Sequence, residues 1–98
     1  MNMQAMLMQA QKMQRDMQKA QKQLEETLFE LESAGGAIKI SYYGNRKIEK
    51  IDIDEDALDD KEMLEDMLKI AINEVNDKVY EAEQAIQNKF TKGMKMPF

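Results

Sequence analysis

The chain has 98 residues, of which 43% are hydrophobic, 6% aromatic and 34% charged, and its formal net charge is -5. This length predicts one small domain over residues 1–98, with a thin core that a partner chain would help to complete. The absence of Cys and His excludes disulfides, thiolate zinc sites, Cys nucleophiles and imidazole bases. No apolar run approaches the roughly 20 residues of a membrane span, so we expect a cytoplasmic protein.

The charge is unevenly distributed along the chain. Residues 1–24 contain four basic residues and one acidic residue, a net charge of +3, whereas residues 52–66 contain nine carboxylates and one lysine, a net charge of -8. A few lysines near the C-terminus follow the last acidic residue. Two basic ends therefore flank an acidic middle, and the net charge conceals a candidate anion-binding surface.

The first predicted element is an amphipathic helix over about residues 2–26. Its residues are good helix formers, and no Gly or Pro occurs before Gly35. Apolar or small residues recur at alternating spacings of three and four, which is the a/d pattern of a heptad repeat. This Met seam consists of Met3, Met6, Ala10, Met13 and Met17, continued by Ala20 and Leu24.

The Met seam is longer than a small sheet can cover. A helix over residues 2–26 measures about 37 Å, whereas a strand of seven residues measures about 23 Å. Packing on the chain's own sheet would leave part of the seam in water, so we expect a second copy of the chain to cover it as a homodimer. A helix lying on a membrane surface is the rival reading, but such helices usually carry Trp, Phe or Leu rather than Met and Ala. We therefore expect no membrane partner.

Three segments after this helix favour strands. In residues 27–33, Phe29 and Leu31 alternate with acidic residues, although the same segment could also continue the helix. Residues 37–43 and 46–53 alternate more clearly, and a two-residue turn signal, Gly44-Asn45, separates them. An antiparallel hairpin is predicted, with residues 27–33 as an ambiguous third strand. The apolar positions of residues 46–53 show one offset, which indicates a bulge.

A second helix is predicted over about residues 60–88. Asp59 and Glu62 have the spacing of a capping box, and Leu58 can pack on Met63 as a hydrophobic staple. Residues 89–98 are predicted to form a short tail. The helix carries an apolar stripe, which consists of Leu64, Leu68, Ala71, Val75, Val79, Ala82 and Ile86.

The acidic run at residues 52–66 offers carboxylates for acid-base or metal chemistry. Paired carboxylates need an enclosed site, however, and a chain of this size offers little cavity. Residues 52–56 imitate the start of a calcium-binding EF-hand loop, but Ala57 and Met63 replace the Gly and the bidentate Glu that such a loop requires. We expect no enzymatic activity, no metal, no cofactor and no small-molecule substrate. Acids at the start of a helix are also favoured by its dipole.

The basic residues of the first predicted helix form a second stripe. They occupy heptad positions c and f, on the face opposite the Met seam, and extend over about 15 Å. Cations on a rigid element, with Gln side chains beside them as donors, suit phosphate contacts that position a duplex without reading its sequence. A solvated helix face is the alternative reading of this spacing. The basic stripe consists of Lys12, Arg15, Lys19 and Lys22.

Three ordered segments resemble the YbaB/EbfC-type nucleoid-associated proteins of bacteria. They are the Met/Gln-rich "LMQAQKMQRDMQKAQKQLEE", the Gly-rich "AGGAIKISYYGNRKIEKIDID" and "LDDKEMLEDMLKIAINEVNDKV", with "MPF" at the end. The resemblance implies an α+β fold, an α-β-β-β-α subunit with a three-stranded antiparallel sheet and two long helices, in an intertwined homodimer. It favours a strand for residues 27–33. It also implies a protein without enzymatic activity that binds double-stranded DNA in the nucleoid and affects its organisation and gene expression.

Within this resemblance, DNA binding is expected to depend on phosphate neutralisation by basic side chains. Any base preference would come from DNA shape or from the Gln side chains. The competing hypothesis is an acidic protein-interaction module or adaptor without direct DNA binding, based on the acidic middle and the adaptable Met surface. The expected DNA contacts are Lys12, Arg15, Lys19 and Lys22, doubled by the dimer, with Lys89, Lys92 and Lys95 as auxiliary contacts.

Overall fold

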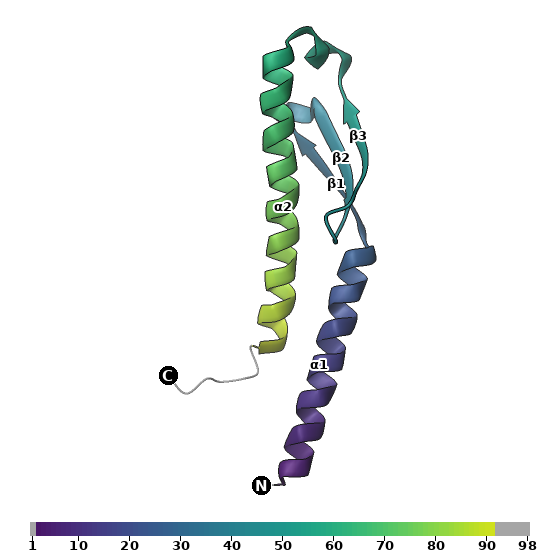
Figure 1. Ribbon diagram of the computed structural model, residues 1–98, viewed down its shortest axis with the longest axis vertical. Coiled ribbons are helices and arrows are strands. Elements are labelled where there is room, and N and C mark those ends of the chain that lie inside the picture. The colour runs from purple at the N-terminus through teal and green to yellow at the C-terminus, as the bar shows by residue number, and fades with distance from the viewer. Residues whose placement is uncertain (1, 92–98) are drawn as a thin grey trace, which may run out of the picture.

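The computed structural model describes residues 2–91, which form an elongated α-β-β-β-α subunit (Figure 1). This order confirms the expected fold class. The main elements are α1 (Met3–Glu26), β1 (Leu28–Ser33), β2 (Ile38–Tyr43), β3 (Ile48–Ile53) and α2 (Lys61–Thr91), with the short 3-10 helices η1 (Ala34–Gly36) and η2 (Glu55–Asp59).

The three strands form one antiparallel sheet in the order β1-β2-β3. The ambiguous residues 27–33 are a strand from Leu28 onward, because Thr27 already has an extended backbone (φ -82°, ψ 132°). Phe29 pairs with Tyr42 across β1 and β2, and their rings stack with centroids 5.6 Å apart. Aromatic cross-strand pairs of this kind stabilise a sheet beyond the area they bury.

The core lies between one face of the sheet and α2. Alternate side chains of β1 and β2 face α2, as period-two alternation requires. The predicted apolar stripe of α2 supplies the opposite side, with Ala71, Val75 and Val79 buried and its remaining members half-buried. Burying one Val, Leu or Ile side chain stabilises the fold by about 1.5–3 kcal/mol. The buried sheet residues are Leu31, Ile38, Ile40 and Tyr42.

The third strand contains the predicted bulge. Ser41 pairs with Lys50 but the next residue, Tyr42, pairs with Ile48, so Glu49 is left without a partner on β2. The extra residue restores the alternation, and the isoleucines of β3 therefore share the core face of the sheet. That part of the face is not covered, because Ile48 and Ile51 are each 41% exposed.

The predicted two-residue turn between β2 and β3 was wrong. Tyr43 donates its N–H to the carbonyl of Lys47 at 2.8 Å, so three residues, 44–46, form the loop. The side chain of Asn45 accepts the N–H of Lys47 at 2.9 Å. Arg46 takes the left-handed conformation, with φ 74°. The Asn45 side chain thus stabilises a turn one residue longer than the dipeptide signal indicates.

The start and the end of α2 also differ from the prediction. Asp60, rather than Asp59, caps the helix, since its carboxylate accepts the N–H of Met63 at 3.1 Å. Asp59 instead ends η2. The proposed staple residues, Leu58 and Met63, are 60% and 46% exposed. The helix continues to Thr91, so residues 89–91 belong to α2 rather than to a tail, and the rest of the predicted tail lies outside the described residues.

Candidate nucleic-acid interface

The first helix projects beyond the sheet and runs beside the C-terminal half of α2 (Figure 1). It begins at a cap, where the side chain of Asn2 accepts the N–H of Gln4 at 3.1 Å. None of its residues is fully buried. Met3 is 82% and Met6 53% exposed, whereas Met13 and Met17 are half-buried. The seam is therefore partly covered by the chain itself at its C-terminal half and uncovered near the N-terminus.

All four cations of the basic stripe are exposed side chains on α1. At about 100° per residue, they fall within an arc of about 80° on the side of the helix away from the Met seam. Among residues 2–91, no carboxylate forms an ion pair with any of these cations. One of them, Arg15, lines a shallow hollow with the amide side chains of Gln11, Gln14 and Gln18. The stripe thus combines unpaired cations with neutral donors, which is the chemistry that phosphate oxygens require.

The structure brings one auxiliary lysine to the basic stripe. Lys89 of α2 and Lys19 of α1 line the same hollow between the two helices, together with Asp16 and Phe90. The Nζ atom of Lys89 lies 5.8 Å from the ring centroid of Phe90. The other two auxiliary candidates, Lys92 and Lys95, lie outside the described residues.

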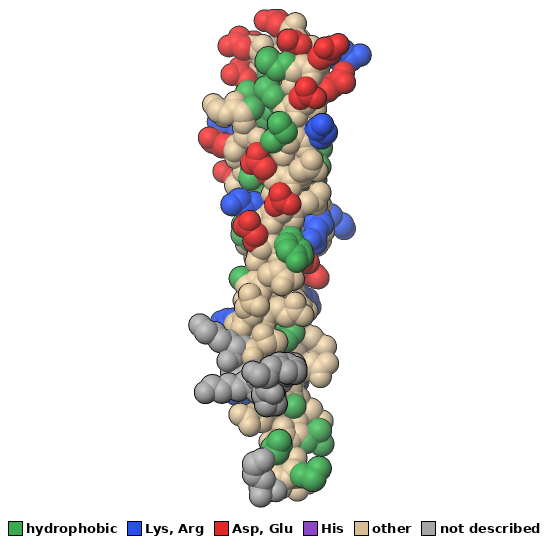
Figure 2. Space-filling model, turned by 90° about the vertical axis from the view of Figure 1, so that its left-hand side faces the viewer, with side chains coloured by type: hydrophobic (Ala, Val, Ile, Leu, Met, Phe, Trp, Pro, Cys, Tyr) green, Lys and Arg blue, Asp and Glu red, His purple; other side chains and the backbone are tan. Residues whose placement is uncertain are grey.

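The acidic run occupies the end of the molecule opposite the N-terminus of α1. Residues 52–66 form the end of β3, η2 and the first turns of α2, and Figure 2 shows Asp and Glu side chains crowded at this end. The six-residue strands that separate this end from α1 measure roughly 20 Å. Charge interactions in water are screened over about 8 Å at physiological salt. The acidic run therefore repels phosphate at the basic stripe only weakly.

The tip of the β2–β3 hairpin holds the base of α1, and sequence reasoning missed this contact. Gly44 donates its N–H to the carbonyl of Thr27 at 3.1 Å. The guanidinium of Arg46 donates two hydrogen bonds to the carboxylate of Glu83 on α2, at 2.7 and 3.1 Å. These bonds lower the pKa of Glu83 and raise that of Arg46. The sequence shows a turn glycine, Gly44, close to a basic residue, Arg46. It does not show which other segments these two residues contact.

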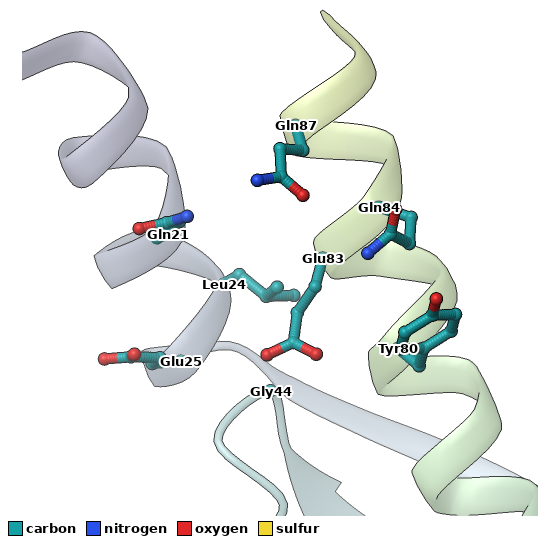
Figure 3. Close-up of a pocket in the computed structure, with 8 residues that line it drawn as sticks. All are labelled: Gln21, Leu24, Glu25, Gly44, Tyr80, Glu83, Gln84 and Gln87. Carbon is teal, nitrogen blue, oxygen red and sulfur yellow. The ribbon is translucent and has the colours of Figure 1, made fainter. Parts of the chain in front are cut away.

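Above this tip, α1 and α2 are separated by a pocket (Figure 3). Leu24 and Glu83 point toward one another across it, and Gly44 lies at its base. The rest of the wall consists of polar or amphipathic side chains from the two helices, Gln21, Glu25, Tyr80, Gln84 and Gln87.

The part of the chain that the structure describes can also be considered for metal clusters and for membrane-spanning helices. Residues 2–91 contain no group of three or more acidic, His or Cys side chains that could hold a metal ion. In the same range, no helix is both long enough and apolar enough to cross a membrane.

Comparison with known proteins adds to this geometry. The sequence matches the YbaB/EbfC DNA-binding family over residues 1–94. A nucleoid-associated protein of Lactococcus lactis is 36% identical over 96 residues, which are 96% of this chain and 97% of that protein. A nucleoid-associated protein of Rickettsia africae is 38% identical over 98 residues, 98% of this chain and 92% of that protein. Another, from Agathobacter rectalis, is 41% identical over 95 residues, 95% of this chain and 84% of that protein.

A solved structure shares the fold. The crystal structure of an uncharacterized protein from Helicobacter pylori superposes with a TM-score of 0.73 at 21% identity and covers 91% of this chain and 96% of that chain. The match in sequence, supported by full-length relatives, settles the family. This chain belongs to the YbaB/EbfC DNA-binding family.

Proposed function

We propose that this protein is a non-enzymatic, nucleoid-associated protein that binds double-stranded DNA as a homodimer, mainly through phosphate contacts, and thereby influences nucleoid organisation and gene expression. The observation that carries this proposal is the basic stripe of α1, whose exposed cations have no acidic partner among residues 2–91. The acidic run lies at the other end of the subunit from α1, so its carboxylates repel phosphate at the basic stripe only weakly.

The dimensions of the stripe fit a duplex. Double-stranded DNA carries about one negative charge per 1.7 Å of its axis, so a stripe of about 15 Å faces several phosphates. The neighbouring glutamines add neutral donors to the same oxygens. Such contacts fix the position of the protein on DNA without specifying a sequence.

Homodimerisation is supported by two apolar surfaces that the chain itself leaves uncovered. One is the N-terminal half of α1, where Met3, Met6 and Leu7 are 82%, 53% and 60% exposed. The other is the outer part of the sheet at β3, with Ile48 and Ile51 each 41% exposed. A second copy would cover apolar area and place two basic stripes on one particle, which strengthens binding through avidity.

A salt-titrated DNA-binding assay tests the proposal. A labelled duplex of about 30 base pairs is titrated with wild-type protein and with the double variant Arg15→Glu, Lys19→Glu, and the mass of each protein is determined by light scattering. The variant removes up to four phosphate contacts per dimer, so the slope of log K against log salt should fall in magnitude by up to about 3.6. DNA affinity should fall at every salt concentration, while the mass stays that of a dimer.

The matched control changes the same charge elsewhere. Lys61→Glu with Lys69→Glu alters two exposed lysines at the acidic end of α2 and should leave DNA binding nearly unchanged. If the stripe variant binds DNA as the control does, the proposed interface is wrong. A wild-type dimer that retards no duplex at low salt would instead favour the protein-interaction module.

A further inference from the structure

The contacts that direct α1 lie along its C-terminal half, where it runs beside α2 and the hairpin tip. None of its residues is fully buried, and the pocket in Figure 3 separates it from α2 near its C-terminal end. Because these contacts are confined to one half of the helix, the direction of α1 is set near its base. At that base lies the hairpin tip, residues 44–46.

Gly44 makes the contact to α1. A Cβ atom placed on Gly44 would lie 1.9 Å from the carbonyl oxygen of Leu24 and 2.8 Å from its Cγ atom. The φ angle of Gly44 is not in the left-handed region. Residues other than proline could therefore adopt this backbone, and glycine is needed because the last turn of α1 comes so close.

Arg46 makes the contact to α2. Its two parallel hydrogen bonds to Glu83 give a fixed geometry that a single bond would not. Arg46 also holds a left-handed backbone, φ 74°, which is costly for a residue with a side chain. The tip thus touches α1 through one residue and α2 through another, two positions apart.

We propose that Gly44 and Arg46 are positioning residues that set the direction of α1 relative to α2, and hence the placement of the basic stripe on DNA. This inference rests on the proposed function. In a dimer with two such arms, both stripes engage one duplex only when the arms point correctly, and avidity is lost when they do not.

Distance measurements between spin labels test directly whether Gly44 and Arg46 set the direction of α1. The chain has no Cys, so Gln4→Cys on α1 and Asn76→Cys on α2 provide unique attachment sites, and dilution with unlabelled protein restricts the signal to one subunit. Gly44→Ala should broaden and shift the distance distribution. A swing of 10° moves Gln4 by about 5 Å, because it lies about 30 Å from the base of the helix.

DNA binding provides the second readout. We expect Gly44→Ala to lower affinity for the 30-base-pair duplex by about a hundredfold or more through lost avidity. When one stripe leaves the duplex, its four cations lose their phosphate contacts, so the magnitude of the salt slope should fall by about as much as in the Arg15, Lys19 variant. The label distances distinguish the two variants, since the stripe variant should leave these distances unchanged.

A second variant covers the case in which Gly44→Ala prevents folding. Arg46→Gly keeps the left-handed backbone accessible and removes only the link to Glu83. It should broaden the label distances, and the exchange Arg46→Glu with Glu83→Arg should restore them in part. Lys47→Gln, which removes one positive charge from the next residue, is the matched control and should leave the distances unchanged.

The outcomes separate the two proposals. Label distances that are the same in wild type, Gly44→Ala and Arg46→Gly would overturn the positioning role, whatever the DNA affinity. DNA binding that survives the stripe variant would overturn the proposed interface. A shift of the label distances in Gly44→Ala or Arg46→Gly would still support the positioning role.

Discussion

Ile40 of β2 and Ile51 of β3 are direct cross-strand partners, yet Ile40 is 1% exposed and Ile51 is 41% exposed. The two side chains share one face of the sheet, so α2 covers that face at β2 and leaves it open at β3. Ile40→Ala is expected to lower the free energy of unfolding by about 2–5 kcal/mol, because it leaves a cavity in the core. Urea unfolding followed by circular dichroism measures this loss. A cost below about 1 kcal/mol would contradict the burial of Ile40.

The exposed partner, Ile51, should matter for self-association instead. If a second copy covers β3, Ile51→Ala will raise the dimer dissociation constant, and the midpoint of unfolding at a given protein concentration will fall. Sedimentation equilibrium measures the constant. Ile72→Ala on α2, where the side chain is 42% exposed, is the control of equal exposure. Equal dissociation constants for both variants and the wild type would show that β3 is not part of the dimer interface.

Two neighbouring aspartates, Asp59 and Asp60, should differ in how much they contribute to folding stability, because only Asp60 caps α2. The carboxylate of Asp60 accepts the N–H of Met63, so Asp60→Ala should cost about 1 kcal/mol of folding stability, the usual value for a lost N-cap. Asp59→Ala should cost clearly less, although it removes the same charge one residue earlier. Thermal unfolding of the two variants side by side gives the comparison, and a larger cost at Asp59 would restore the capping box that the sequence suggested.

The ion pair between Arg46 and Glu83 should make stability depend on pH. Hydrogen bonds from Arg46 hold the pKa of Glu83 below its ordinary value of 4.5. A carboxylate with a lowered pKa stabilises the fold above the unfolded-state pKa, and this contribution is lost as pH falls through the folded-state pKa. The stability difference between wild type and Glu83→Gln should therefore be present at pH 7 and shrink progressively below pH 4.5.

Urea midpoints measured from pH 7 down to pH 3 test this dependence. Glu81→Gln is the control, since the carboxylate of Glu81 makes only a 3.9 Å contact to Lys78 on the helix surface. A wild-type advantage over Glu83→Gln that stays constant across this range would argue against a lowered pKa at Glu83.

Lys89 should contribute to DNA binding because it shares a hollow with Lys19. Lys89→Glu removes up to two phosphate contacts per dimer, so the salt slope should fall in magnitude by up to about 1.8. Lys78→Glu on the same helix, where the side chain is 58% exposed, is the control. Equal slopes for both variants in the salt-titrated assay would restrict the interface to α1.

Much of the fold was predictable because it depends on local periodicity. Burial of Ile38 and Ile40 follows from period-two alternation, and burial of Val75 and Val79 follows from helical spacing. Errors arose where neighbouring residues offer nearly equivalent local structures. Either of two adjacent aspartates can cap a helix, and the side chain of Asn45 can stabilise a longer turn as readily as a shorter one.

The candidate site was predictable in part. The spacing of the basic stripe follows from helix geometry, and the structure places all four cations on the exposed side of α1; their contacts with DNA stay a prediction. Lys89 was proposed only from its charge. Its place beside Lys19 follows from the antiparallel return of α2 along α1, which the spacing of charges on one helix does not encode.

The sequence by itself determined the two helices, the β2–β3 hairpin, their apolar faces and the two stripes of the first helix, because these depend on neighbours within a few positions of one another; residues 27–33 stayed open between strand and helix. Tertiary structure alone decided that the acidic run lies far from the basic stripe, that Gly44 lies against Leu24 and that Arg46 reaches Glu83. Such contacts join segments distant in the chain, and they form only when the hairpin folds back between the two helices.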